Sequence, residues 1–265
     1  MFFGKKTKRF LNRFLIIDKM ELMSFHERSK ISLEEIVNKL NQAFSPVSVV
    51  LYGSRARTDF LERSDYEIGL FCSQDNPVIW EDVKKVVNEK GINIYPFVYE
   101  DFLKGDFDTP FQKTIYKREL IVAGKTLSGE NIQGLTPPKI KILDLIEDVR
   151  FNSGYALASL ISLRNRDNTS ASLKFYKSVL FATRSPIMLQ TRQFPYTYDD
   201  ILGFSRKIDL GHYQELVEKA YKIRKRDGTI KAQEIIRNIT YINNFIEPFL
   251  KREYDKNKDL IVIKN

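Results

Sequence analysis

A helical repeat of apolar residues is the first element that the pattern of the chain predicts. Apolar side chains recur at intervals of three and four residues, which places them on one face of a helix. These positions are Leu33, Ile36, Val37, Leu40 and Phe44. Ser32 precedes the repeat, with Glu35 three positions later, which is the spacing of a capping box. The pattern therefore predicts a helix that begins just after Ser32.

Short apolar runs, separated by polar turns and helical repeats, follow this first helix. Strands are predicted over 47–52, 65–71, 92–98 and 120–123, and helices over 77–90 and 111–119. The strands and helices alternate, and the connections between them are short. This order predicts an α/β domain with a small mixed sheet.

The pattern changes after 128–138, a segment rich in Gly, Ser and Asn that ends in two prolines. Helical repeats dominate the rest of the chain, separated by polar or Gly/Pro breaks. They cover 139–163, 172–190, 199–208, 212–224 and 229–251. Short loops favour antiparallel neighbours, so the sequence predicts an all-α bundle of five helices. Pro186 and Pro248 are expected to bend or thin the helices that contain them.

Composition limits the classes of protein and of site that are compatible with this two-part chain. Its 265 residues suffice for two domains, and no apolar run approaches the length of about eighteen residues that predicts a membrane span. Cys72 is the single cysteine of the sequence, which excludes an intramolecular disulfide and fits a reducing, cytoplasmic setting. The two histidines, His26 and His212, argue against a zinc site or a histidine-based triad.

Basic residues are concentrated at the N-terminus. The net charge of the chain is +9, and the first twenty residues contribute +5 of it. The charged residues there are Lys5, Lys6, Lys8, Arg9, Arg13, Asp18 and Lys19. A basic arm for nucleic acid or another anionic surface is one interpretation, and a loosely held extension is the other. We favour the second and expect 1–28 to be dispensable for folding, because the predicted capping box follows it.

The candidate functional residues are concentrated in a Gly-Ser turn and in a pair of acidic residues that follows it. Gly53 and Ser54 end an apolar, β-branched run, so the turn lies at the exposed end of a buried strand. Asp65 and Glu67 stand two positions apart at the start of the next strand, so both carboxylates face one side. Such acids repel each other unless a cation neutralises them, and Mg²⁺ binds one or two carboxylates together with substrate phosphates. The pattern indicates chemistry on a nucleoside triphosphate.

These residues resemble the nucleotidyltransferase superfamily related to DNA polymerase β. In that superfamily a hydrophobic strand, Gly-Ser, and Asp-x-Asp or Asp-x-Glu follow one another. The likeness is to the kanamycin nucleotidyltransferase type, and it is carried by Tyr52-Gly53-Ser54, Arg57 and Ser64-Asp65-Tyr66-Glu67. The resemblance implies an α/β nucleotidyltransferase domain over 29–130, followed by a helical, HEPN-like substrate-binding bundle over 136–255.

The resemblance also implies a reaction and a role for each residue of the motif. An acceptor hydroxyl would attack the α-phosphate of a metal-bound NTP, expected to be ATP, and pyrophosphate would leave. Gly53 and Ser54 would hold the outer phosphates, and Arg57 would neutralise the charge of the triphosphate. Asp65 and Glu67 would be the catalytic acids that ligate Mg²⁺. A small hydroxylated molecule is the expected acceptor, ahead of a protein side chain or an RNA end.

Two positions depart from the pattern of this family. The family usually places a third carboxylate on the next strand, where this chain has Asn93, which offers only a neutral oxygen. Its antibiotic-modifying members also take a general base from the first helix of the helical domain. Glu147 and Asp148 are candidates in this region, with Glu147 taken as the catalytic one, although Phe151 aligns best with the base. Alternatively, both acids belong to the polar face of an amphipathic helix.

These departures leave a second function open, that of a non-catalytic nucleotide-binding regulatory or antitoxin-like protein of the same fold. A ribonuclease role is disfavoured. Arg206 and His212 have the spacing of the HEPN ribonuclease motif, but Asp209 and Gly211 indicate a loop between helices there. Nucleic-acid binding and a homodimer are left open, and nucleic acid is not the favoured partner.

Overall fold

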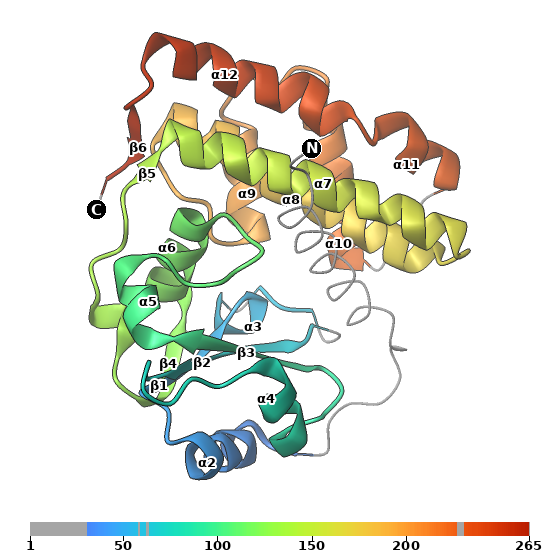
Figure 1. The fold of residues 1–265 in the computed structure, drawn as a ribbon. Helices are drawn as coiled ribbons and strands as arrows, with labels where there is room; N and C mark the ends of the chain where they lie inside the picture. The colour runs from blue at the N-terminus through green and yellow to red at the C-terminus, as the bar shows by residue number, and fades with distance from the viewer. Residues whose placement is uncertain (1–30, 58, 62–63, 227–230, 265) are drawn as a thin grey trace, which may run out of the picture.

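The computed structural model of the protein describes residues 31–57, 59–61, 64–226 and 231–264. A small sheet with its helices forms one part, and a bundle of longer helices lies against it (Figure 1). The predicted fold class, an α/β part with a small mixed sheet followed by an all-α bundle, is confirmed. The predicted basic extension, 1–28, lies outside the described residues.

The sheet has four strands in the order β3-β2-β1-β4. β1 (Ser48–Tyr52) lies between β2 (Tyr66–Cys72) and β4 (Lys125–Gly129) and is antiparallel to both. β3 (Ile92–Val98) is parallel to β2, which makes the sheet mixed. All residues of β1 are buried, as expected for a continuous apolar run at the centre of a sheet covered on both faces.

One face of the sheet packs against α2 (Leu33–Phe44) and α4 (Trp80–Val86), in a core that includes Val49 of β1. α2 begins as predicted, because the Ser32 hydroxyl accepts a hydrogen bond from the backbone N–H of Glu35 at 3.1 Å. This side-chain cap satisfies one of the N–H groups that a helix start leaves without an intrahelical partner. α4 is shorter than the helix predicted over the same region.

The opposite face packs against α5 (Tyr99–Lys104) and α6 (Lys113–Ala123) in a core rich in aromatic side chains. The predicted strand over 120–123 is wrong, because α6 continues through these residues and the strand follows as β4. Leu120 and Ile121 are buried as parts of the helical face that covers the sheet. Here tertiary packing overrides a local sequence that is equally apolar in a strand or in a helix.

The bundle is built on two long helices, α7 (Ile142–Arg164) and α8 (Asn168–Thr191), which lie side by side (Figure 1). α9 (Tyr198–Ser205) and α10 (Tyr213–Arg226) pack against α8. The buried apolar residues of these helices and of the C-terminal ones form one continuous core. Among the helices of the described ranges, none has the length and apolar character needed to cross a bilayer.

The last helix predicted from the sequence is divided into three. α11 (Ala232–Asn238) is followed by a π-helical turn, η2 (Ile242–Ile246), and then by α12 (Glu247–Lys256). Pro248 has no N–H to donate to the carbonyl four residues before it, so the regular ladder is interrupted at this point. Pro186, in contrast, lies inside α8, which continues past it.

A short strand pair that the sequence did not predict joins the linker to the C-terminal end. β5 (Ile140–Lys141) precedes α7 and pairs antiparallel with β6 (Ile261–Ile263). Arg118 of α6 donates hydrogen bonds to the carbonyl of Pro138 at 2.9 Å and to the carbonyl of Lys264 at 3.1 Å. This buried arginine therefore holds the linker and the C-terminal strand against the sheet part. A 3₁₀ turn, η1 (Ile132–Gly134), lies earlier in the same linker.

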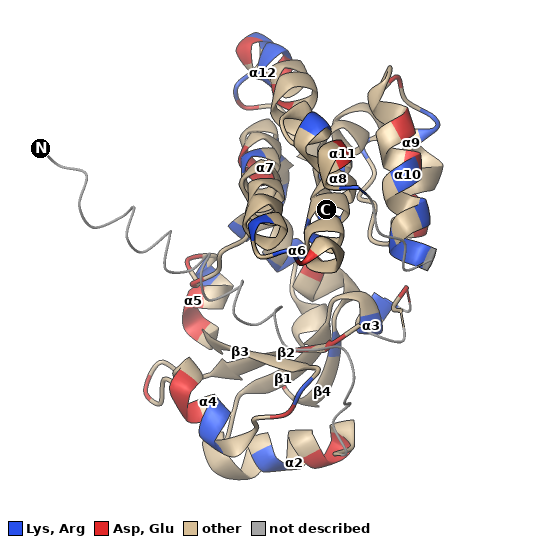
Figure 2. Ribbon diagram, turned by 90° about the vertical axis from the view of Figure 1, so that its right-hand side faces the viewer, with Lys and Arg blue, Asp and Glu red and all other residues tan. Residues whose placement is uncertain are grey.

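Charged residues of both signs are mixed along α2, α4, α7 and α12 (Figure 2). Such mixing is usual for helices whose outer faces meet water. Buried charged residues are the exception, and in the described part of the chain they include Asp59, Arg118, Asp148, Lys174 and Arg184. A buried charge is costly unless it is paired, so these residues mark places where the fold depends on a polar contact.

Replacing Arg118 by alanine should lower the free energy of unfolding by about 2–3 kcal/mol, because two carbonyls lose a charged hydrogen-bond donor. Urea-induced unfolding measures this change. Arg252 is exposed on α12 and provides the matched control, since its replacement by alanine should change stability by less than about 0.5 kcal/mol. Equal stabilities of the two variants would show that Arg118 does not hold the linker.

Candidate functional site

The predicted Gly-Ser turn lies at the end of β1. Gly53 has a φ of 72°, in the left-handed region, and α3 (Ser54–Arg57) starts directly after it. A Cβ at Gly53 would lie 1.7 Å from Oε2 of Glu67, so a side chain there would collide with the carboxylate. Only glycine combines an unstrained left-handed backbone with the absence of a Cβ. The backbone of Gly53 therefore lies in contact with one of the two predicted acids.

The two predicted acids and Asn93 meet at the same edge of the sheet. Glu67 of β2 lies between Tyr52 of β1 and Asn93 of β3 in the strand register. Asp65 directly precedes β2, and its Oδ2 accepts a hydrogen bond from Nδ2 of Asn93 at 3.1 Å. Asp65 is exposed to solvent and Glu67 is half-buried. The strand period thus brings together the three side chains that the sequence placed at the site.

Burial raises the pKa of Glu67 above its usual value. The positive charges of Lys177 and Arg57 oppose this shift, whereas the negative charges of Glu119 and Asp65 add to it. Lys177 belongs to α8, so the helical bundle contributes a cation to the surroundings of this carboxylate. Burial is thus the main reason for the raised pKa of Glu67, and a cation bound beside the carboxylate would offset it.

The donor set at this edge fits a hard cation, because it consists of carboxylate oxygens. Asp65 and Glu67 are the residues that could hold a divalent metal ion, and Asn93 could add a neutral oxygen. Within the ranges that the structure describes, no group of three or more His, Cys, Asp or Glu side chains is arranged to hold a metal ion. A metal bound here would therefore draw other ligands from substrate or water.

Arg55 lies in α3, the short helix that follows the Gly-Ser turn. Its guanidinium group lies 4.8 Å from the ring centre of Phe60 and 4.2 Å from that of Tyr66. Its Nε donates a hydrogen bond to the carbonyl of Ser64 at 2.8 Å. Arg55 thus connects the start of α3 with the residue that precedes Asp65.

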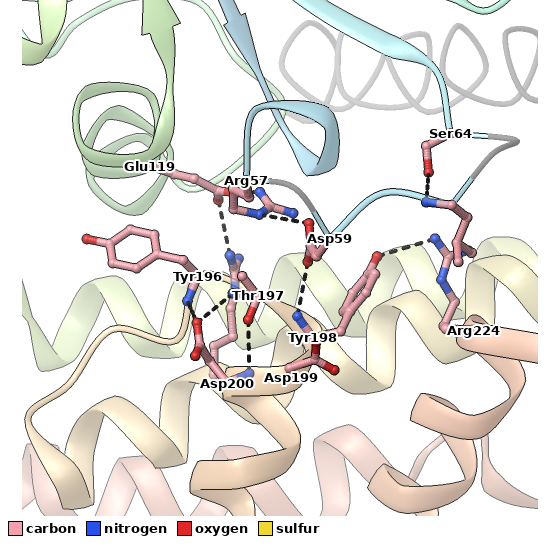
Figure 3. A network of polar contacts seen from close by, with 12 residues as sticks. Arg57, Asp59, Ser64, Glu119, Tyr196, Thr197, Tyr198, Asp199, Asp200 and Arg224 are labelled. Atoms are coloured by element: carbon pink, nitrogen blue, oxygen red, sulfur yellow. Dashed lines mark hydrogen bonds and ion pairs between the residues drawn. The ribbon is translucent and has the colours of Figure 1, made fainter.

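Arg57 lies in a buried network of charges, with its side chain only 5% exposed. It forms an ion pair with Glu119 of α6, and its Nε lies 3.5 Å from Oδ1 of Asp59 (Figure 3). Asp59 in turn accepts a hydrogen bond from the backbone N–H of Tyr198 at 3.1 Å. The role expected for Arg57, contact with a triphosphate, stays a prediction.

The two acids considered for a general base lie in different surroundings on α7. Glu147 is exposed and accepts a hydrogen bond from Nε2 of Gln112 at 3.3 Å. Asp148 is buried, with Oδ1 3.7 Å from Nη2 of Arg184, and burial raises its pKa to about 6. Phe151 packs edge-on against Phe111, with 5.2 Å between ring centres. The role of Glu147 as base stays a prediction.

Three charged residues that interact with Glu67 or with Arg57 were not identified as site residues from the sequence, namely Asp59, Glu119 and Lys177. In the sequence, each of them is indistinguishable from an ordinary polar residue of a loop or an amphipathic helix. Their importance depends on partners in other elements, as with Glu119 and Arg184, which are 65 positions apart and 3.1 Å from each other. No local pattern could have indicated these pairs.

The residues considered for a ribonuclease motif, Arg206 and His212, lie at the two ends of the connection between α9 and α10. His212 is exposed and directly precedes α10. Arg206 is also exposed, and its Nε lies 3.2 Å from a carboxylate oxygen of Glu218. Both observations agree with the loop expected between these helices.

Comparison with known proteins gives a structural likeness alone. No family model and no curated protein matches the sequence. The structure is similar to that of the spectinomycin adenyltransferase AAD(9) from Enterococcus faecialis, solved with ATP and spectinomycin, with a TM-score of 0.51 and 14% sequence identity. The similarity covers 82% of this chain and 100% of that chain. At this identity it shows a shared fold, and the kanamycin type and the HEPN-like bundle stay predictions.

Replacing Glu67 by glutamine should raise the melting temperature at pH 7. Because the pKa of Glu67 is raised in the folded state, the folded protein loses stability as the pH increases from about 4.5 through that higher value. Glutamine removes this loss, so the difference between variant and wild type should vanish at about pH 3.5, where the acid is protonated in both states.

Thermal unfolding at the two pH values checks this expectation. The matched control is Glu81→Gln on α4, where the side chain is exposed and the melting temperature should not change. A lower melting temperature of the Glu67 variant at pH 7 would mean that the attraction of Lys177 and Arg57 outweighs the cost of burial.

Proposed function

We propose that the protein transfers a nucleotidyl group from a nucleoside triphosphate, expected to be ATP, to a hydroxyl group of a small molecule. The observation that carries this proposal is the contact of the Gly53 turn with Glu67, with Asp65 and Asn93 at the same edge. The fold shared with AAD(9), which was solved with ATP and spectinomycin, supports it.

In the proposed reaction, a bond forms between the acceptor oxygen and the α-phosphorus, and the bond from that phosphorus to the pyrophosphate oxygen breaks. The proton of the acceptor hydroxyl passes to a base. Transfers of this kind depend mainly on positioning and on stabilisation of charge. The backbone at Gly53 and the hydroxyl of Ser54 would contact the outer phosphates, and Lys177 would add positive charge from the bundle.

Asp65 and Glu67 are the residues that would hold Mg²⁺ in this proposal. Both are hard oxygen donors, and a cation beside the half-buried Glu67 would offset the repulsion and burial that raise its pKa. Bound Mg²⁺ would supply Lewis-acid polarisation and neutralise charge on the phosphates. The exposure of Asp65 leaves this edge accessible to a nucleotide.

Glu147 is the proposed base for the acceptor hydroxyl. Its side chain is exposed on α7 and is oriented by the hydrogen bond from Gln112. Asp148 is a poor candidate, because it is buried and faces Arg184 and Ser185. The acceptor would therefore lie between the sheet part and the first helix of the bundle.

Replacing Asp65 by asparagine should weaken Mg²⁺-dependent binding of ATP by at least about tenfold, since loss of even an outer-sphere partner of a metal costs that much. The thermal stability should change little, because Asp65 is exposed. Calorimetric titration with ATP in the presence and absence of Mg²⁺ measures the effect. Asp75→Asn, at an exposed loop position, is the matched control. Unchanged Mg²⁺-dependent affinity in the Asp65 variant would rule out this metal site.

A second candidate function, a nucleotide-binding regulatory protein without turnover, is favoured by Asn93. Its side chain occupies the position expected for a third carboxylate and donates a hydrogen bond to Asp65. The site then carries two negative charges instead of three. A second metal ion would depend on oxygens of the nucleotide, and weak or absent catalysis would follow.

The variants Asn93→Asp and Asn93→Glu separate these two functions. If the missing carboxylate limits turnover, either variant should raise the rate of nucleotidyl transfer, by about tenfold if the gain in transition-state stabilisation is about 1.4 kcal/mol. Transfer from α-labelled ATP to a panel of small hydroxylated acceptors measures the rate. Increased metal binding with no transfer in either variant would favour the binding function.

A further inference from the structure

We propose that Glu119 is a positioning residue that fixes the helical bundle against the phosphate-binding turn by holding Arg57 and Arg184 together. This proposal rests on the nucleotidyl transfer proposed above for its functional consequence, but its structural content can be tested separately. In this proposal Arg57 connects the sheet part to the helical bundle and does not bind the triphosphate.

The first observation is a continuous row of alternating charges, which we call the charge row. It consists of Asp59, Arg57, Glu119, Arg184 and Asp148. These residues come from the loop after α3, from α3, from α6, from α8 and from α7. Their side chains are between 3% and 15% exposed. The row therefore crosses from the sheet part into the bundle within the protein interior.

Glu119 is the centre of the charge row because it contacts a guanidinium group on each side. One carboxylate oxygen pairs with Arg57, and the other accepts a hydrogen bond from Nη1 of Arg184 at 3.1 Å. The two arginines lower the pKa of Glu119 against the effect of burial, so the ionised form is the stable one. Without this negative charge, two buried guanidinium groups would face each other across the joint.

The sheet side of the charge row is connected directly to the phosphate-binding turn. α3 has only four residues, from Ser54 to Arg57, and the backbone N–H groups of Ala56 and Arg57 donate to the carbonyl of Gly53 at 3.2 Å each. A constraint on the Arg57 side chain is therefore a constraint on the orientation of the Gly53 turn. Asp59 adds a second anchor through the N–H of Tyr198 at the start of α9.

The bundle side of the charge row is connected to the acids through α8. Lys177 and Arg184 stand seven positions apart, which places them on one face of that helix. Phe181 lies between them, with Nζ of Lys177 5.9 Å and the guanidinium carbon of Arg184 4.4 Å from its ring centre. The contact of Arg184 with Glu119 therefore sets where Lys177 lies relative to Glu67.

Together these connections explain why Arg57 is unsuited to bind phosphate. Its side chain is 5% exposed and is committed to two carboxylates from different elements. A move toward a triphosphate would leave Glu119 and Asp59 buried and without their cation, which is strongly unfavourable. The same arginine in its present place instead aligns the turn, Glu67 and Lys177.

The test is the variant Glu119→Gln, which keeps the shape of the side chain and removes its charge. Nitroxide labels on cysteines introduced at Glu34 of α2 and Arg252 of α12, both exposed, report the distance between the two parts. Cys72 does not interfere, because it is buried and burial raises the pKa of its thiol to about 11. We expect one narrow distance distribution in the otherwise wild-type protein and a broadened or shifted one in the variant.

Kinetics and binding provide the second readout. In Glu119→Gln, kcat for transfer should fall at least about tenfold, whereas the affinity for Mg²⁺ and ATP should not increase, because Asp65 and Glu67 are unchanged. The conservative variant Glu119→Asp retains the charge and should recover part of both the distance distribution and kcat. Glu81→Gln, at an exposed position, is the matched control and should resemble the wild type.

An unchanged distance distribution together with kcat within twofold of the wild type would overturn the proposal. Tighter ATP binding by Glu119→Gln, with the distance unchanged, would also overturn it, since Arg57 would then have been released to bind phosphate. If Glu119→Gln does not fold, Arg184→Gln removes the same contact from the bundle side, and its distance distribution and kcat are judged by the first of these criteria. If the wild type shows no transfer with any acceptor, the distance measurement still decides the structural role of Glu119.

Discussion

The contact between Glu67 and the Gly53 turn is the constraint on which the candidate site depends. β1 and β2 pair with Tyr52 opposite Glu67, so the residue after Tyr52 must turn beside that carboxylate. Gly53 meets this demand with a left-handed backbone and no Cβ. A single strand register therefore places the turn and both acids. A slip of one residue would move Glu67 to the opposite face of the sheet, among the apolar side chains of the other core.

This register has an electrostatic cost, which the surrounding elements only partly offset. Glu67 is half-buried, with Asp65 close by, and burial raises its pKa. Arg57 and Lys177 supply positive charge, but Glu119 lies close enough to raise the pKa of Glu67 as well. The cost therefore comes mainly from burial of the Glu67 carboxylate, and the nearby charges leave it partly uncompensated. Residues that destabilise the ligand-free protein are common at functional sites, because a residue suited to bind a ligand is seldom the one that best stabilises the free protein.

Local periodicity accounts for what the sequence could predict. The strand period of two brought Asp65 and Glu67 to one side, and the apolar repeat after Ser32 predicted the first helix. The same reasoning failed at 120–123, because Leu120 and Ile121 are as apolar in a helix that covers a sheet as in a strand. It also could not find the pairing of β5 with β6, which joins segments about 120 positions apart and is only a few residues long. Glu119 shows the same limit, since its partners lie in α3 and α8 and no local pattern refers to them.

Arg57 illustrates how a motif residue can fit a sequence pattern and still lie in an unexpected place. Its position three residues after Ser54 resembles that of an arginine in the kanamycin nucleotidyltransferase type. In this chain, however, α3 is so short that the side chain at its last residue reaches α6 and the loop that meets α9. A buried guanidinium group between two carboxylates is more strongly held than an exposed ion pair, so its release would cost more than a solvated phosphate contact could return. In the proposed reaction, the charge of a bound triphosphate would then be met by Lys177 and by a cation at Asp65 and Glu67, while Arg57 would maintain the geometry in which these groups face one another.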